Sequence, residues 1–87
     1  MIKDRLEFPI NPSDIIAYCN LNVGLEICYV VEIQHNILKV RRFNDDGTIR
    51  DRVTELPHVN QCLVLGADTI PNKYWRTINE LDHERVS

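Results

Sequence analysis

The sequence predicts a mainly β (α+β) fold, a small five-stranded antiparallel barrel or roll with a C-terminal helix. Three observations support this prediction. Short segments rich in β-branched and aromatic residues follow one another between residues 14 and 65. Turn-forming residues separate these segments at short intervals. After residue 70 the apolar residues recur at the three- and four-residue steps that are typical of a helix.

The length and composition indicate one folded domain. The chain has 87 residues, of which 44% are hydrophobic and 26% are charged. These values are typical of globular proteins, although the core of such a small domain is thin. We divide the single domain 1–87 into an extended N-terminal arm (1–13), a β core (14–65) and a C-terminal helix (70–84).

The N-terminal arm contains two prolines, Pro9 and Pro12. Each proline pushes the residue before it towards extended backbone. We expect the arm to lie along the body of the domain, anchored by Leu6, Phe8 and Ile10.

Two short segments open and close the predicted sheet. Residues 14–20 (DIIAYCN) predict the first strand, and residues 21–25, which include Gly24, predict the turn after it. Residues 62–65 (CLVL) predict a short apolar strand that ends at Gly66.

The C-terminal helix is predicted from four apolar residues at helical spacing: Tyr74, Trp75, Ile78 and Leu81. Thr69 is its predicted cap, with Pro71 in the first turn. A helix of this length is marginal alone, so we expect its aromatic face to dock on the sheet. Tyr74 and Trp75 are also candidate interface aromatics, although core packing is the more common role of such a stripe.

Residues 26–34 and 37–43 predict a central hairpin. His35 and Asn36 tolerate left-handed backbone, so they form a plausible two-residue turn. Pairing Gln34 with Ile37 puts three pairs on an apolar face: Ile33 with Leu38, Val31 with Val40, and Tyr29 with Arg42. The opposite face then carries Glu32 with Lys39, Val30 with Arg41, and Cys28 with Phe43. A slip of one residue would turn the apolar set outward, which favours this register.

A second turn, Asn44 to Gly47, precedes a predicted strand over residues 48–54. Two registers compete for this strand. In the first, Phe43 pairs with Thr48, and the outer face then sets Arg41 against Arg50 and Lys39 against Arg52. In the second, Asn44 pairs with Thr48, which joins Arg41 to Asp51 but puts Arg52 beside Val40. Burying an unpaired arginine costs more than crowding two exposed ones, so we predict the first register.

The strand rhythm of residues 14–65 resembles that of small Src-homology-3-like barrels of the Tudor and KOW types. Three segments carry the resemblance: PSDIIAYCN, GLEICYVVEIQHNILKVRRFNDDG and CLVLG. Domains of this type bind short peptides, modified side chains or nucleic acid, so the resemblance implies a binding function. The sequence has no clear counterpart of an aromatic cage, and no residue role is carried over.

A cluster of basic residues is the sharpest functional signal: Lys39, Arg41, Arg50 and Arg52. Residues 39–52 contain five bases and three acids, a local charge of +2 in a chain whose net charge is −3. Four like charges on adjacent strands attract an anion, such as an acidic protein surface or nucleic-acid phosphates. The competing interpretation is an ordinary solvated strand face.

Metal binding and catalysis have weak support. Cys19, Cys28, His58 and Cys62 include the ligand types that zinc prefers, but their spacing is not that of a zinc finger or knuckle. A reactive cysteine needs a base and an electropositive pocket, whereas Cys19 and Cys28 fall in predicted strands. We therefore predict no metal, no cofactor and no catalytic residue.

The location follows from three features. The N-terminus is charged from its third residue and has no apolar signal region. The apolar runs are far shorter than the roughly 20 residues of a membrane span. Three cysteines are an odd number, which fits reduced thiols. We expect a cytoplasmic protein with no membrane partner.

We thus expect a non-enzymatic binding module that acts through protein–protein interaction, as an adaptor, subunit or inhibitor. Its partner is expected to be a protein with an acidic surface. Its small size is common among phage-encoded and other accessory proteins. One alternative is a small nucleic-acid-binding barrel that uses the basic strand face. Another is a structural protein that assembles with itself through exposed strand edges.

Overall fold

A computed structural model describes residues 2–20, 24–56 and 61–86. Within these ranges, five antiparallel strands form one sheet in the order β4-β3-β2-β1-β5. The strands are β1 (Ile15–Asn20), β2 (Gly24–Gln34), β3 (Ile37–Phe43), β4 (Ile49–Leu56) and β5 (Cys62–Val64). A short 3-10 turn, Ala67–Thr69, leads to helix α1 (Asn72–Val86). The predicted mainly β fold with a C-terminal helix is confirmed.

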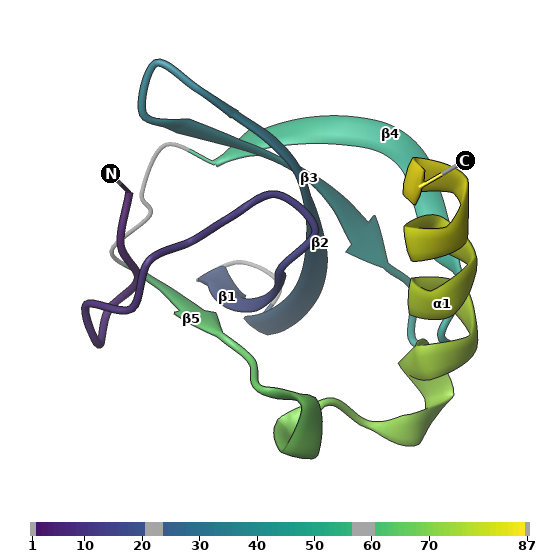
Figure 1. Cartoon of the computed structure of the whole chain (residues 1–87). Coiled ribbons are helices and arrows are strands. Elements are labelled where there is room, and N and C mark those ends of the chain that lie inside the picture. Colours follow the sequence, from purple (N-terminus) through teal and green to yellow (C-terminus); the bar gives the residue numbers. More distant parts are fainter. Residues whose placement is uncertain (1, 21–23, 57–60, 87) are drawn as a thin grey trace.

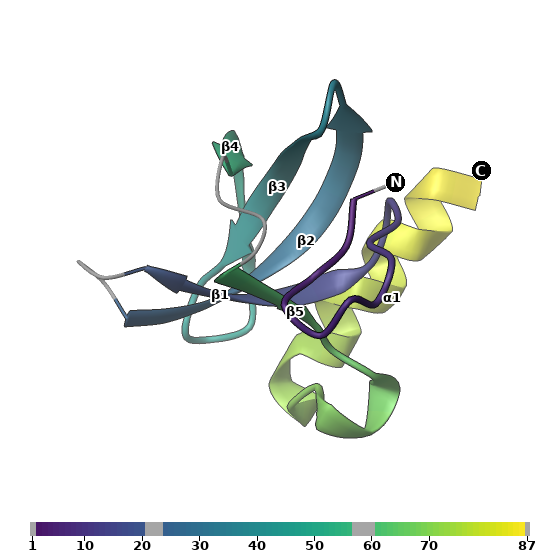
Figure 2. The same ribbon diagram turned by 90° about the vertical axis from the view of Figure 1, so that its left-hand side faces the viewer.

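The sheet is open, because no ladder among the described residues joins its edge strands β4 and β5. Figure 1 shows α1 on one side of the sheet and the N-terminal arm on the other, and Figure 2 shows the strong curvature of the sheet. Each side has its own hydrophobic cluster. The arm-side cluster consists of Ile2, Ile10, Ile16, Tyr18, Cys28, Val30, Leu38, Val40, Leu56 and Cys62. The helix-side cluster consists of Ile15, Tyr29, Phe43, Ile70, Tyr74 and Ile78.

The N-terminal arm is part of the core, but its anchors differ from those predicted. Ile10 is buried as expected, whereas Leu6 and Phe8 are 64% and 58% exposed. Ile2 supplies the second buried anchor. Leu6 and Phe8 are exposed because they lie on a tight turn that is closed by the Asp4 N–H donating to the Phe8 carbonyl oxygen at 2.9 Å.

The strand ends differ slightly from the prediction. Gly24 and Leu25 already belong to β2, so the turn predicted over 21–25 is wrong at its second half. Residues 21–23 lie outside the described residues. Thr69 does not cap α1. Its hydroxyl donates to the Gly66 carbonyl oxygen at 2.8 Å, within the preceding 3-10 turn.

The β2–β3 hairpin has the predicted turn, and both turn residues are left-handed, with φ 51° at His35 and 64° at Asn36. Three predicted pairs next to the turn are confirmed: Gln34–Ile37, Ile33–Leu38 and Glu32–Lys39. Beyond them the prediction is wrong by one residue. Val31 is an extra residue in a bulge, so the next pairs are Val30–Val40, Tyr29–Arg41 and Cys28–Arg42.

This bulge exchanges the faces of β2 beyond it. Val30 and Cys28 join the arm-side cluster, while Tyr29 belongs to the helix-side cluster. In a regular strand Ile33 would share its face with Val31, and Val30 would point to the other side. With the bulge, Ile33 and Val30 both face the arm-side cluster, while Val31 packs against the helix-side cluster.

The β3–β4 pair follows neither predicted register throughout. Next to the turn Phe43 pairs with Ile49, which is the register that we rejected. The ladder then shifts, and Arg41 pairs with Val53 while Lys39 pairs with Glu55. Between these pairs β4 contains two more residues than β3. The predicted oppositions of Arg41 to Arg50 and of Lys39 to Arg52 are therefore wrong.

Candidate functional site

Three arginines converge on one hollow at the β3–β4 end of the sheet. The hollow has a volume of about 240 Å³ and is lined by Arg42, Arg50, Arg52 and Thr54. We call it the arginine hollow. Its lining comes from two neighbouring strands, so a rigid sheet sets the spacing of its charges.

Strand alternation and the β4 irregularity together create the arginine hollow. On β3, Arg42 shares a face with Leu38 and Val40, which are fully buried in the arm-side cluster. On β4, Thr54 pairs with Val40, and Arg52 lies on the same side by alternation. Because of the irregularity, Val40 pairs with Thr54 and not with Arg52. The register next to the turn therefore does not bury an unpaired arginine beside Val40.

Arg42 is held by a carboxylate on β2. Its Nε atom lies 3.1 Å from Glu26 Oε2, and the two side chains are only 23% and 10% exposed. The contact is an ion pair without hydrogen-bond alignment, because neither atom has a hydrogen-bond partner among the described residues. One of the three positive charges in the hollow is therefore balanced by the protein itself.

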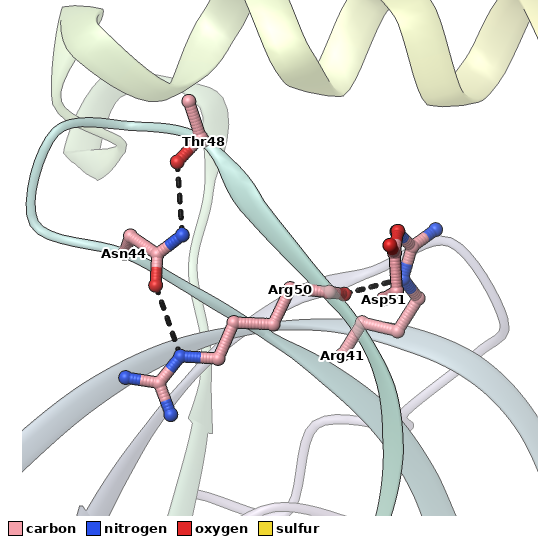
Figure 3. A network of polar contacts seen from close by, with 5 residues as sticks. All are labelled: Arg41, Asn44, Thr48, Arg50 and Asp51. Carbon is pink, nitrogen blue, oxygen red and sulfur yellow. Dashed lines mark hydrogen bonds and ion pairs between the residues drawn. The ribbon is translucent and has the colours of Figure 1, made fainter.

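Arg50 is positioned by the turn that precedes it. Its Nε–H donates to Asn44 Oδ1 at 3.0 Å, and Asn44 Nδ2 donates to the Thr48 hydroxyl at 2.9 Å. Figure 3 shows Asn44 between these two residues. Within the described residues only Nε of Arg50 has a partner, so its terminal guanidinium nitrogens stay available to a ligand.

The same turn is fastened to α1. The Thr77 hydroxyl donates to the Gly47 carbonyl oxygen at 2.7 Å, and Lys73 Nζ donates to the Asp45 carbonyl oxygen at 2.7 Å. The Asp46 carboxylate accepts from the Thr48 N–H at 2.9 Å and the Thr48 hydroxyl at 2.6 Å, and this holds the pKa of Asp46 below its usual value. Helix, turn and Arg50 therefore form one connected unit.

Arg52 is the third member of the hollow. Its side chain is exposed, and among the described residues it has no ion-pair or hydrogen-bond partner. An exposed, uncompensated guanidinium beside two others is favourable only when the solvent or a ligand balances the charge.

The structure divides the four predicted basic residues into two groups. Arg50 and Arg52 line the hollow, but Lys39 and Arg41 share the opposite face of β3 with Phe43. Lys39 Nζ donates to Gln34 Oε1 at 2.9 Å and lies 3.5 Å from Glu32 Oε1. The predicted single basic face made of all four residues is therefore wrong.

Arg41 has partners of its own on β4. Its Nε donates to the Arg50 carbonyl oxygen at 2.7 Å, and its Nη2 lies 3.2 Å from Asp51 Oδ1 (Figure 3). Arg41 thus supports the irregular part of β4 and does not line the hollow.

Two members of the site, Arg42 and Asn44, are not among the predicted site residues. The predicted register places Arg42 on an apolar face, a position where an arginine is itself an unusual signal. The sequence pattern indicates only a turn at Asn44. Its link to Arg50 depends on the register next to the turn, which the sequence pattern does not determine.

The two candidate interface aromatics belong to the helix-side packing. Tyr74 is 7% exposed, and its ring contacts Phe43 edge to face with centroids 5.1 Å apart. Trp75 is half-buried against the same cluster. The assignment of Tyr74 as an interface residue is therefore wrong, because its ring is used to dock α1 on the sheet.

Cys28 and Cys62 have the environment of core thiols. Cys28 and Cys62 are fully buried, and burial raises the pKa of Cys28 to about 12 and that of Cys62 to about 11. Such thiols stay protonated at neutral pH, which is opposite to the requirement for a nucleophile. Cys19 is exposed, and His58 lies outside the described residues. Within the described ranges, no three His, Cys, Asp or Glu side chains are grouped to hold a metal.

A larger hollow of about 440 Å³ lies beside the N-terminal arm and is lined by Phe8, Pro9, Asn11, Asp14, Val64 and Gly66. Its lining is mainly apolar and includes one carboxylate, which already accepts from the Asn11 N–H at 2.7 Å. It has no concentrated charge that would select a ligand, so the arginine hollow is the better candidate site.

The class of protein that these features define is a small, mainly β domain with a cationic hollow. Comparisons with protein-family models, with curated proteins and with solved structures found no match. In the described part of the chain, no helix has the length and apolar character needed to cross a membrane.

Proposed function

We propose that this protein is a non-enzymatic binding module that binds an acidic site on a partner protein through the arginine hollow. The observation that carries the proposal is the convergence of Arg42, Arg50 and Arg52 on one hollow, with one carboxylate in direct contact. Arginine is favoured at such interfaces because its planar fork pairs with acidic groups through two hydrogen bonds. The role would be that of an adaptor, subunit or inhibitor.

The distribution of charge favours a protein partner over nucleic acid. Nucleic-acid backbones need a row of cations along a groove, because their phosphates are spaced along the strand. Here Lys39 and Arg41 lie on the other face of β3 and have carboxylate partners. The net charge of −3 also opposes general binding to a polyanion.

The strand edges disfavour self-assembly as the main role. The β5 edge is covered by the arm, where the Arg5 N–H donates to the Cys62 carbonyl oxygen at 2.9 Å. The β4 edge has an irregular ladder and carries Arg50, Asp51, Arg52 and Glu55. Bulges and charges are common features that keep edge strands from pairing with one another.

A cytoplasmic location is part of the proposal. Cys28 and Cys62 are free thiols in the core, and neither is paired. Buried unpaired thiols are typical of proteins from reducing compartments.

The test is a pull-down from lysate of the native cells, with and without nuclease. We compare the wild type with Arg50→Glu/Arg52→Glu and with the control Lys39→Glu/Arg76→Glu, which changes the net charge equally. We expect a nuclease-resistant protein partner that is lost in the first variant and kept in the control. With the purified partner, affinity should fall at least about tenfold in the first variant.

Two results would contradict the proposal. Loss of the captured material after nuclease treatment would indicate a nucleic-acid-binding domain. Equal capture by both variants would show that the interaction does not use the arginine hollow. Circular dichroism and thermal melting check that each variant is folded.

A further inference from the structure

We infer that the arginine hollow selects a doubly charged phosphate monoester, presented by a phosphorylated side chain of the partner protein. This inference rests on the proposed function and specifies the acidic group that is bound. It follows from the charge of the hollow, from its hydrogen-bond donors and from its isolation.

The charge of the hollow matches a dianion. Three guanidinium groups line it, and the Glu26 carboxylate contacts one of them. Three positive charges and one negative charge leave a net charge of +2 among the contacting groups. A phosphorylated serine or threonine carries close to two negative charges at neutral pH, whereas a carboxylate or a phosphodiester carries one.

The donors suit a group with three acceptor oxygens. Arg50 keeps its terminal nitrogens free because only Nε is bound by Asn44, and Arg52 has its whole guanidinium free among the described residues. Thr54 adds a hydroxyl at the same wall. A carboxylate has two oxygens to offer, whereas a phosphate monoester has three and can accept from two arginine forks at once.

The geometry of Arg50 is set before a ligand arrives. Asn44 holds Arg50, and the turn that carries Asn44 is bonded to α1 through Thr77 and Lys73. A preorganised donor loses less side-chain entropy on binding than a free arginine does. This arrangement favours a single, well-defined anion over a diffuse acidic surface.

Isolation of the hollow favours one phosphate group over a strand of them. The basic side chains on the other face of β3, Lys39 and Arg41, are engaged with Glu32 and Asp51. Glu26 and Asp45 line an adjoining hollow on the other side of Arg50 and would repel a second phosphate. A polynucleotide would have to cross these acids.

Isotope-edited NMR of the arginine Nε–H groups provides the first test. Methyl phosphate, dimethyl phosphate, acetate and sulfate are added separately at pH 7.5. We expect methyl phosphate and sulfate, both dianions, to shift the Arg50 and Arg52 signals and to bind roughly tenfold more tightly than the two monoanions. Equal binding of all four anions, or no binding, would overturn the inference.

The pH dependence gives a second signature. The second pKa of a phosphate monoester is about 6, so lowering the pH from 7.5 to 5.5 should weaken methyl phosphate binding roughly fourfold. Sulfate keeps both charges over this range and should bind equally at both values. Among the described residues, the titratable or charged groups around the hollow are Glu26, Cys28, Arg42, Asp45, Arg50 and Arg52, and none of these is a histidine. Sulfate binding that follows the same pH curve would show that the protein titrates instead, against the inference.

Variants link these signals to the hollow. Arg52→Gln removes a side chain without a partner among the described residues, so it should leave the fold intact and weaken methyl phosphate binding about tenfold. Asn44→Ala should weaken binding through Arg50, and the control Lys39→Gln/Arg76→Gln should not change it. Unchanged binding in Arg52→Gln would contradict the inference.

The source of the phosphate is resolved with three larger probes: a peptide with one phosphoserine, the same peptide with glutamate, and a DNA strand with a 5′-phosphate. We expect preference for the phosphoserine peptide over its glutamate form. Preference for the DNA strand, or for the glutamate peptide, would overturn the inference. The proposed function would still stand if the glutamate peptide bound through Arg50 and Arg52, so the two failures are distinguishable.

Discussion

Gly47 brings the β3–β4 turn against the backbone of α1. Its φ is +92°, a conformation that suits glycine, and a Cβ placed there would overlap the backbone carbonyl of Lys73. The turn therefore rests directly on the helix backbone. The position of Arg50, and with it the arginine hollow, depends on this contact through Asn44.

Gly47→Ala should lower the free energy of unfolding by at least about 2 kcal/mol, because the new methyl group strains the backbone and displaces α1. Chemical denaturation measures this effect. Gly66→Ala is the control, since nothing lies within 4 Å of a Cβ at that position and its φ is −74°. Equal stability of the two variants would show that the turn does not depend on contact with α1.

The buried thiols predict a loss of stability in alkaline solution. The pKa of Cys28 is about 12 in the folded protein, above its ordinary value of 9.0, because burial disfavours the thiolate. The raised pKa contributes stability that is fully present below pH 9. This contribution is lost as the pH rises towards 12, since the unfolded chain releases the proton first.

Unfolding free energies measured at pH 8 and pH 10.5 test this sign. Cys28→Ala should be less stable than the wild type at pH 8, because it leaves a small cavity, but should lose less stability on going to pH 10.5. Comparing the two slopes cancels the titration of tyrosine and lysine. A slope identical to that of the wild type would contradict the assignment.

At the scale of elements, irregular strands decide which side chains lie on which face. The bulge at Val31 puts Ile33 and Val30 on the arm-side face of β2, and the two extra residues of β4 bring Arg52 into the hollow. Each irregularity changes which side chains of the strand point to which side of the sheet. The hollow is therefore a product of strand irregularity and not of composition alone.

Substitutions in the tight turn of the β2–β3 hairpin should stabilise the protein. His35 and Asn36 both have positive φ, which glycine and asparagine accept at lower cost. His35→Asn/Asn36→Gly should raise the free energy of unfolding by about 1 kcal/mol. The opposite change, Asn36→Val, should destabilise the protein, and thermal melting distinguishes them. Stabilisation by Asn36→Val would show that the turn has another conformation.

At the scale of the whole molecule, one buried carboxylate ties the N-terminal arm to the edge strand β5. Asp4 is 5% exposed and accepts from the N–H groups of Leu6, Phe8 and Val64 at 2.9, 2.8 and 2.8 Å. The arm is thus tied to β5, a strand that is far away in the sequence, and covers one hydrophobic cluster.

Asp4→Ala should lower the free energy of unfolding by about 3 kcal/mol, since three backbone amides lose a charged acceptor. Asp4→Asn keeps one carbonyl oxygen and should have an intermediate effect. Urea denaturation gives the energies, and hydrogen exchange at the Val64 amide reports the local change. Asp82→Ala, on the exposed face of α1, is the control. A stable Asp4→Ala protein with a protected Val64 amide would contradict this role.

The elements were predictable from local patterns. The His35-Asn36 turn, the strands around it and the helical spacing after Pro71 each depend on neighbouring residues, and the fold has them. Ladder positions far from a turn were not predictable. The position of a bulge depends on which side chains the two layers on either side of the sheet bury, and this is a property of the assembled sheet.

The candidate site was predicted in part for the same reason. Arg50 and Arg52 belong to the predicted basic cluster and both line the hollow, because like charges close together in sequence can be noticed without knowing the strand register. The irregular ladders decide which face each strand residue lies on. As a result, Arg42 lines the hollow, whereas Lys39 and Arg41 lie on the other face.

The sequence by itself determined that this protein is a small, mainly β domain with a C-terminal helix and a cationic middle, because propensity, turn chemistry and charge are local quantities. Only the tertiary structure decided which arginines share a hollow, which aromatic rings serve the core and how the arm is held. Those outcomes depend on contacts between residues distant in sequence, where burial on two faces of one sheet outweighs the regular alternation of each strand.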